Sequence, residues 1–516
     1  MNSEEKDEAL KVFAKGAGIS FFGLAFGAGI AYLYRLLIAR LFGPSDYGLF
    51  SLGISVFAIG TTVAKMGLPQ GVARFVAFYK GKKDKPRLKG TLTSGYKLTL
   101  ITGTLIGIIL FILSDWLSIF VFNNPGFSSI LKAFSIAIPF NAFLIVTVGG
   151  MRGFQKLKYK VYSYDIFHHS MILILILVAF WLGFGILGAS IGYALSFIFS
   201  ACVAFYLLNN KIFSVFNKKI KSKPVYKNLL NFSVPLMFAS VLLSLIGKLD
   251  TLMLGIFSTS AQVGIYNAAF PTAFLLTLVL GSTEMIFMPM SSEMLAKNLM
   301  DEIRSVFHVV TKWMFSITFP LLLLMVFFSR PLLRILFGAE YVSGAAALSI
   351  LAAGYFVASA VGPTGATLQT LGKTKIFLMN NIVVLGINVA LNLYLIPLYG
   401  IVGAATATAV SFALWNLLTL FEVYYFSKIQ PFRFVFLKPT LAASISILAV
   451  YYLAKILHAR TIFSLTPLLL LFLLLYFVLF LLFKGFEEED IMILITIEKR
   501  LGLDLKLLKN LFKKFL

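Results

Sequence analysis

The chain has 516 residues, of which 59% are hydrophobic and 13% are charged, and its mean hydropathy is +0.92. A soluble domain uses about 25% charged residues to cover its surface, so this composition excludes an ordinary soluble protein and predicts a membrane protein. The net charge of +24 does not indicate nucleic-acid binding, because the basic residues lie in short segments between apolar runs. Cys202 is the single cysteine, which excludes an intrachain disulfide.

The polar segment 1–11 precedes an apolar run that is longer than a signal-peptide core, so we expect this run to remain as a membrane span. Fourteen runs are long enough to cross a hydrocarbon core of about 30 Å. The expected spans lie near 13–42, 48–79, 91–113, 128–151, 159–182, 186–208, 229–256, 262–292, 306–328, 342–371, 375–396, 400–426, 439–457 and 464–483.

The connecting segments alternate in charge. Lysine and arginine are concentrated in 80–89, 152–160 and 209–228, whereas the turns near 43–47 and 114–127 contain neither residue. Cytoplasmic loops of membrane proteins carry this excess of positive charge. We therefore expect a multi-pass protein of the cytoplasmic (plasma) membrane, with an even number of spans and both termini in the cytoplasm.

Two pairs of stretches recur at an offset of about 215 residues, which indicates an internal duplication. Residues 37–50 (LIARLFGPSDYGLF) match 252–266 (LMLGIFSTSAQVGIY), with one residue inserted. Residues 182–197 (LGFGILGASIGYALSF) match 397–412 (PLYGIVGAATATAVSF). Six spans per copy is an even number, so both copies enter the membrane with the same orientation, as parallel repeats do.

The fold class predicted by this pattern is an all-α polytopic membrane protein with two six-helix lobes and two additional helices. The expected parts are an N-lobe (1–208), a cytoplasmic linker (209–228), a C-lobe (229–426), spans 13 and 14 (427–484) and a cytoplasmic tail (485–516). Leucine and phenylalanine recur at helical spacing in the tail and would form one face of a helix, and most of its lysines lie outside this face. The tail is therefore either a helix on the anionic inner leaflet or a helix packed on the protein's own loops.

Lysines interrupt two stripes of small polar residues, and a cation at mid-membrane costs roughly 2.5–3.5 kcal/mol. One stripe comprises Ser51, Ser55, Thr62, Lys65 and Pro69. The other comprises Ser233, Met237, Ser240, Ser244, Lys248, Thr251 and Gly255. Each follows helical spacing, so the stripes are expected to line a wet cavity. The alternative is close helix packing by small residues, with each lysine reaching a headgroup.

Acidic and amide side chains within the spans are candidates for gating or for binding a coupling ion. They are Asp165, near Tyr162 and His169, then Glu284, Asn381, Asn388 and Asn392. His168 and His169 are adjacent and diverge on a helix, so no metal site is expected. The sequence contains no phosphate-binding loop, zinc-protease motif or nucleophile elbow, so we expect neither an enzyme nor a bound cofactor.

The hairpin motifs RLFGP (40–44) and YGLF (47–50), with Arg35 before them, resemble the first-hairpin signature of polysaccharide-biosynthesis flippases. These proteins form the Wzx-like branch of the multidrug/oligosaccharidyl-lipid/polysaccharide (MOP) superfamily. KLD (248–250) followed by VGIY (263–266) resembles the same signature in the second lobe. The likeness extends over the whole chain.

This resemblance implies a V-shaped transporter that flips a lipid-linked oligosaccharide or polysaccharide repeat unit by alternating access. It also implies that Arg35, Lys65 and Lys248 hold the polyprenyl pyrophosphate. Membrane lipids are the expected surroundings, Na+ and H+ are both candidate coupling ions, and we expect a monomer. Cation-coupled multidrug exporters and lipid II-type flippases of the superfamily are alternatives. A membrane glycosyltransferase is disfavoured, because the longest outer loop has about fourteen residues (114–127).

The repeat offset, carried back from the hairpins without gaps, pairs Arg35 with Asp250. The two residues then lie at matching depths in the first span of each copy. We expect them to approach each other when the outer side is closed, which would avoid leaving either charge alone in the membrane. The alternative is that each residue serves its own lobe, with Asp250 near Lys248.

Overall fold

The computed structural model describes residues 3–458 and 461–487, with side chains from residue 22 onward. Within these residues every regular element is helical, which confirms the predicted all-α class. The chain divides into two compact units, Met1–Gly264 and Ile265–Leu516, and the division falls within helix α10 (Ser260–Phe274). The predicted tail falls almost wholly on residues outside the described part of the chain.

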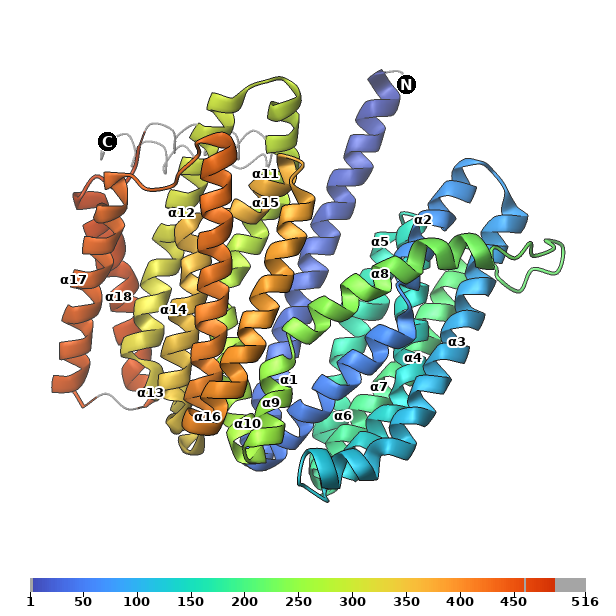
Figure 1. The fold of residues 1–516 in the computed structure, drawn as a ribbon, viewed down its shortest axis with the longest axis horizontal. Coiled ribbons are helices and arrows are strands. Elements are labelled where there is room, and N and C mark those ends of the chain that lie inside the picture. Colours follow the sequence, from blue (N-terminus) through green and yellow to red (C-terminus); the bar gives the residue numbers. More distant parts are fainter. Residues whose placement is uncertain (1–2, 459–460, 488–516) are drawn as a thin grey trace. The chain divides into compact units, whose positions relative to one another are not determined.

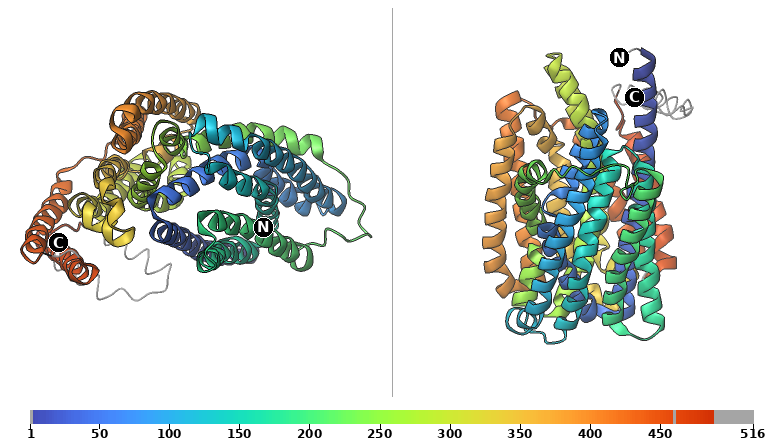
Figure 2. Two further views of the ribbon diagram at one scale, coloured as in Figure 1. Left: turned by 90° about the horizontal axis from the view of Figure 1, so that it is seen from below. Right: turned by 90° about the vertical axis from the view of Figure 1, so that its right-hand side faces the viewer.

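The first unit is a bundle in which α3, α4, α6 and α7 run alongside one another (Figures 1 and 2). Its helices are α1 (Ser3–Lys65), α2 (Leu68–Gly81), α3 (Lys85–Trp116), α4 (Phe127–Gly153), α5 (Leu157–Lys160), α6 (His169–Trp181), α7 (Gly185–Lys211), α8 (Tyr226–Ile246) and α9 (Leu249–Phe257). Two π-helical segments, η1 (Leu117–Val121) and η2 (Val161–His168), extend α3 and precede α6.

Aromatic side chains form the centre of this bundle. Phe57 of α1, Phe134 of α4 and Tyr193 of α7 have ring centroids 5.4–6.0 Å apart. Phe50 and Phe197 complete the cluster at similar distances. All five side chains are buried. Edge-to-face and tilted contacts of this kind each add roughly 0.5–1.5 kcal/mol to the burial of apolar area, so the cluster fixes α1 against α4 and α7.

Helix α1 is two helices joined at Gly43, whose φ of 77° and ψ of 175° form a combination that is essentially restricted to glycine. Pro44 then begins the second helix, where its missing N–H costs no hydrogen bond. Figure 1 shows the chain turning back at this point. The predicted hairpin between the first two apolar runs is therefore confirmed, with a turn of one non-helical residue instead of the expected five.

In the second unit, three clusters of buried apolar side chains lie between the helices of the described residues, and α17 and α18 lie side by side. Its elements after α10 are α11 (Thr277–Ala296), α12 (Met300–Phe327), α13 (Ser329–Leu336), η3 (Ala339–Gly344), α14 (Ala345–Val361), α15 (Thr364–Thr370), α16 (Thr374–Ser427), η4 (Phe434–Phe436), α17 (Leu437–Ile456) and α18 (Ile462–Leu482). Helix α16 also consists of two helices, which meet at Gly400 with a φ of 55°.

Among the described residues, eleven helices are long and apolar enough to cross a membrane, or twelve if the bent pair α10 and α11 forms one span. Four expected spans are interrupted, one of them at Gly362 and Pro363 between α14 and α15. Met66 and Gly67 separate α1 from α2, Gly247 and Lys248 separate α8 from α9, and residues 275–276 separate α10 from α11. Hydropathy treats such segments as continuous, because it records side chains and not backbone angles.

Candidate functional site

Two of the three predicted substrate-binding cations lie at helix breaks. Lys65 is the last residue of α1, immediately before the left-handed residues Met66 and Gly67. Lys248 precedes the first residue of α9, after α8 has ended at Ile246. Interrupted helices leave backbone N–H and C=O groups without partners in the same helix, and transporters use such groups to bind ions and charged substrates.

Arg35, the third cation, is surrounded by tyrosines. It interacts electrostatically with Tyr34, Tyr47 and Tyr193. All three tyrosines are buried, whereas Arg35 is only partly buried. Arg35 and Lys248 also act on each other electrostatically, so two of the predicted cations belong to one region of the first unit.

None of the three cations forms an ion pair with a carboxylate of the described residues. No ion pair joins Arg35 and Asp250 in this structure, and their approach when the outer side is closed stays a prediction. Asp250 lies in the first turn of α9 and is 6% exposed.

Several members of the two polar stripes serve helix packing. Ser51 and Ser55 are buried, and the Ser55 hydroxyl donates to the Ser51 carbonyl within α1 at 2.9 Å. Ser233 of α8 is also buried, and it lies directly against Gly67 and Gly71. These three residues fit the close-packing alternative. Lys65 and Lys248 are partly exposed, so an open cavity along the whole of each stripe is not required to solvate them.

A buried ion pair between the end of α5 and η2 was missed by the sequence analysis. Lys160 Nζ lies 2.8 and 2.6 Å from the two carboxylate oxygens of Asp165, and the two side chains are 10% and 4% exposed. An α-helix would place these residues about 140° apart, because each residue advances 100°. The wider π-helical turn aligns residues five apart, which brings the pair together.

The same π-helical segment contacts α1 at glycines. A Cβ atom at Gly23 would lie 2.9 Å from Asp165 Oδ2, and one at Gly27 would lie 3.3 Å from the His169 ring. His169 Nδ1 lies 3.0 Å from the carbonyl oxygen of Tyr164, and the neighbouring His168 Nδ1 lies 3.2 Å from Ser200 Oγ. The histidines diverge as predicted. Among the described residues, no group of three His, Cys, Asp or Glu side chains could hold a metal ion.

The remaining predicted residues lie in the second unit and bond mainly within their own helices. The Asn381 amide donates to the Phe377 carbonyl, and the Asn392 amide donates to Asn388 Oδ1 at 3.0 Å. Glu284 of α11 lies near Gly365.

Glu422 was not predicted as a site residue. It accepts a hydrogen bond of 2.6 Å from the Asn380 amide, across the two halves of α16. The sequence did contain a signal for this contact, because Glu422 is the single acidic residue in the expected span 400–426.

Comparisons with known proteins agree with this architecture. The family profile described as "Polysaccharide biosynthesis protein" matches residues 13–295, and the profile "MatE" matches residues 235–394. The first match covers more than half of the chain. A solved structure described as "Lipid II flippase MurJ, inward closed conformation" shares the fold with a TM-score of 0.71 at 16% identity, over 93% of this chain and all of the other.

Two curated relatives match most of the chain. A "Probable low-salt glycan biosynthesis flippase Agl15" of Haloferax volcanii is 27% identical over 426 residues, which cover 80% of this chain and 83% of the relative. An uncharacterized membrane protein of Methanocaldococcus jannaschii is 26% identical over 460 residues, which cover 83% and 86%. The chain therefore belongs to the polysaccharide biosynthesis protein family, the flippase-type branch of the MOP superfamily.

Proposed function

We propose that the protein flips a lipid-linked oligosaccharide or polysaccharide repeat unit across the cytoplasmic membrane, and that Arg35, Lys65 and Lys248 bind its polyprenyl pyrophosphate. The observation that carries this proposal is that these three cations have no carboxylate partner among the described residues. The electrostatic interaction between Arg35 and Lys248 is repulsive, so an anion between them would relieve it.

The chemistry of the helix breaks supports the same substrate class. A cation without a partner is costly inside a membrane, roughly 2.5–3.5 kcal/mol at the centre of a span. A pyrophosphate offers several anionic oxygens, and free backbone N–H groups at an interrupted helix are additional donors to it. Lys65 and Lys248 each lie beside such an interruption.

The proposed transport cycle requires a topology that we assign as follows. The twelve candidate spans, with α1 and α16 each counted as two spans because they turn at Gly43 and Gly400, make fourteen. Both termini are then cytoplasmic, and the lobes 1–208 and 229–426 are parallel repeats that alternate access to the two sides of the membrane.

Gating or ion coupling is assigned to Arg35, Asp250, Asp165, Glu284, Asn381 and Asn388, with Na+ or H+ as the coupling ion. The buried Lys160–Asp165 pair supports a role for Asp165. A proton or a cation that binds to its carboxylate would change the net charge of the pair inside the membrane. The protein is proposed to work as a monomer.

Reconstituted vesicles that contain a polyprenyl-pyrophosphate oligosaccharide test the proposal. Lys65→Ala and Lys248→Ala should each reduce the flipping rate by about tenfold or more, because a hydrogen bond to a charged group is worth roughly 1.5–3 kcal/mol. Lys→Arg at either position should retain more activity, since the charge survives. Lys218→Ala, in the exposed linker, is the matched control. A wild-type rate in the Lys65→Ala, Lys248→Ala double variant would refute the pyrophosphate assignment.

A multidrug exporter is the second candidate, because the MatE profile matches residues 235–394. The same vesicles distinguish the two functions. An exporter would move a cationic dye along an ion gradient and leave the lipid-linked sugar in place. A flippase of the lipid II type, the type to which the structural neighbour MurJ belongs, would move lipid II in preference to polysaccharide repeat units.

A further inference from the structure

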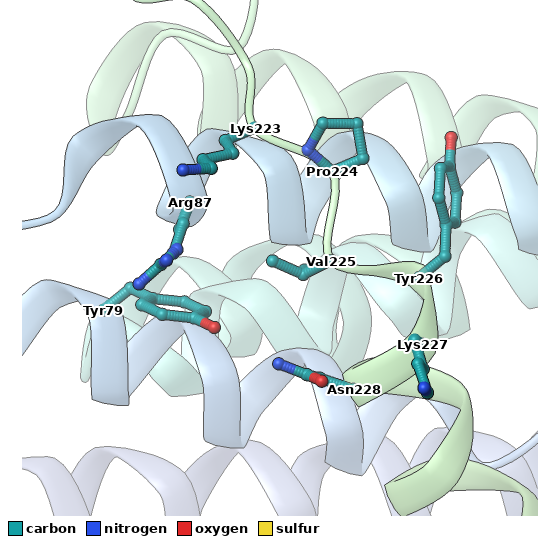
Figure 3. A pocket seen from close by; sticks show the side chains of 8 residues that line it. All are labelled: Tyr79, Arg87, Lys223, Pro224, Val225, Tyr226, Lys227 and Asn228. Carbon is teal, nitrogen blue, oxygen red and sulfur yellow. The ribbon is translucent and has the colours of Figure 1, made fainter.

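A basic pocket of about 320 Å³ lies where the ends of α2, α3 and α8 meet the linker (Figure 3). This volume is within the range of small-ligand sites, about 300–1,000 Å³. Its lining contains three cationic side chains and no carboxylate. The lining residues are Tyr79, Arg87, Lys223, Pro224, Val225, Tyr226, Lys227 and Asn228.

The linker wall of the pocket is fixed to α3 by hydrogen bonds. Lys89 is buried, and its ammonium group donates to the carbonyl oxygens of Asn217 at 2.7 Å and Ile220 at 3.0 Å. The Lys223 N–H donates to the Pro86 carbonyl at 3.0 Å, and the Val225 N–H donates to Ser94 Oγ at 3.4 Å. The linker segment 217–225, which the sequence shows only as a charged connection, is therefore held against α3 and forms one side of the pocket.

Tyr79 lines the pocket and has an unused donor. The side chain is 4% exposed, and no group of the described residues forms a hydrogen bond with its hydroxyl. Figure 3 shows this hydroxyl pointing toward the amide of Asn228 across the pocket. The Arg87 guanidinium lies 6.0 Å from the Tyr79 ring centroid and is only loosely paired with Asp84, at 3.6 Å.

The N-terminus of α8 adds donors to the same pocket. Tyr226, Lys227 and Asn228 are its first three residues, and Val225 before them supplies no side-chain cap. The first turn contains no acidic residue. Backbone N–H groups at a helix N-terminus carry partial positive charge and bind phosphate readily.

We propose that this pocket binds a phosphate group, held by Arg87, Lys223, Lys227, the Tyr79 hydroxyl and the N-terminus of α8. The phosphate belongs either to the headgroup of an anionic membrane lipid or to a soluble phosphate ion, and the two sources share this recognition chemistry. Binding ties the linker end at 223–225 to α2 and α3. The site is separate from the Arg35, Lys65 and Lys248 cations, so it does not depend on the proposed transport substrate.

Titration of the purified full-length protein in a neutral detergent tests the proposal, with binding followed by calorimetry. The probes are dihexanoyl phosphatidylglycerol and inorganic phosphate, used separately. Lys223→Gln with Lys227→Gln should weaken binding about tenfold or more, as expected for lost charge-assisted contacts. Lys218→Gln with Lys219→Gln removes the same charge from exposed linker positions outside the lining and should change it less than about twofold. Tyr79→Phe should weaken binding about fivefold, for one lost hydrogen bond.

The outcomes separate the sources and decide the proposal. Binding of both probes, with mutual competition, supports a general phosphate site, whereas binding of the lipid alone or of phosphate alone supports that source. Failure of the wild-type protein to bind either probe would overturn the proposal. So would equal losses in the two lysine double variants, or an unchanged affinity in Tyr79→Phe, because either result indicates diffuse surface charge. Unchanged melting temperatures verify that each variant is folded.

Discussion

The hydroxyl groups of Ser45 and Ser260 are joined by a hydrogen bond of 2.8 Å, although the residues are 215 positions apart. This separation equals the repeat offset found in the sequence, so equivalent turns of the two copies meet each other. The contact is reciprocal. A Cβ at Gly48 would lie 1.8 Å from the Ser260 carbonyl oxygen, and one at Gly264 would lie 1.9 Å from the Pro44 carbonyl oxygen. Reciprocal contacts of this kind are expected where two equivalent turns are related by a two-fold axis.

The serine contact predicts a cross-link. With Cys202→Ala as background, Ser45→Cys with Ser260→Cys should form an intramolecular disulfide under mild oxidation, because the two side-chain oxygens are 2.8 Å apart. Counting free thiols by mass spectrometry measures it. If this contact must open during transport, the oxidised protein should stop flipping and recover on reduction. Full flipping by a completely cross-linked protein would show that the hairpins stay together throughout the cycle.

The close approach of the backbone at Gly48 and Gly264 predicts that even an added methyl group at these positions is destabilising. Gly48→Ala should lower the melting temperature in detergent, or separate the hairpins and abolish the Ser45–Ser260 cross-link, because backbone atoms must move away from the new methyl group. Gly29→Ala in α1 is the matched control, since a Cβ there meets nothing within 4 Å. It should be neutral or slightly stabilising, by up to about 1 kcal/mol. Equal behaviour of the two variants would contradict the close approach.

The buried Lys160–Asp165 pair predicts an asymmetry between single and double variants. Lys160→Met or Asp165→Asn should each lower the free energy of unfolding, by about 3–5 kcal/mol for the lysine variant, because one charge stays buried alone. Lys160→Met with Asp165→Leu should recover much of the loss, since no charge remains. Denaturant unfolding in detergent measures the difference. Additive losses in the double variant would show that the ion pair is not the cause.

The proposed topology predicts which exposed positions react from outside the cell. In the Cys202→Ala background, cysteine at Gly126 or Thr259 should react with an impermeant thiol reagent applied to intact cells. Cysteine at Lys83 or Lys221 should react only after the cells are lysed. All four positions are exposed, so burial does not confound the comparison. Labelling of the Lys83 position in intact cells would invert the assigned orientation.

Much of the architecture follows from the sequence, because it depends on local properties. Mean hydropathy identified the membrane class, and apolar run lengths placed most helices close to their observed bounds. The short polar turn near 43–47 between two apolar runs indicated the first hairpin, which the structure places at Gly43. The 215-residue offset was likewise visible in the sequence, as were the cations Arg35, Lys65 and Lys248, because charge in an apolar run stands out.

Only the tertiary structure decided which of these residues meet. The pairing of Lys160 with Asp165 depends on a π-helical turn, which no periodicity of 3.6 residues predicts. Ser51, Ser55 and Ser233 are equally polar whether they face water or a neighbouring helix. Only the structure shows that these three side chains are buried between helices. The Ser45–Ser260 contact joins residues distant in the chain. Local composition cannot specify such contacts, because they depend on how whole helices are packed and where their backbones break.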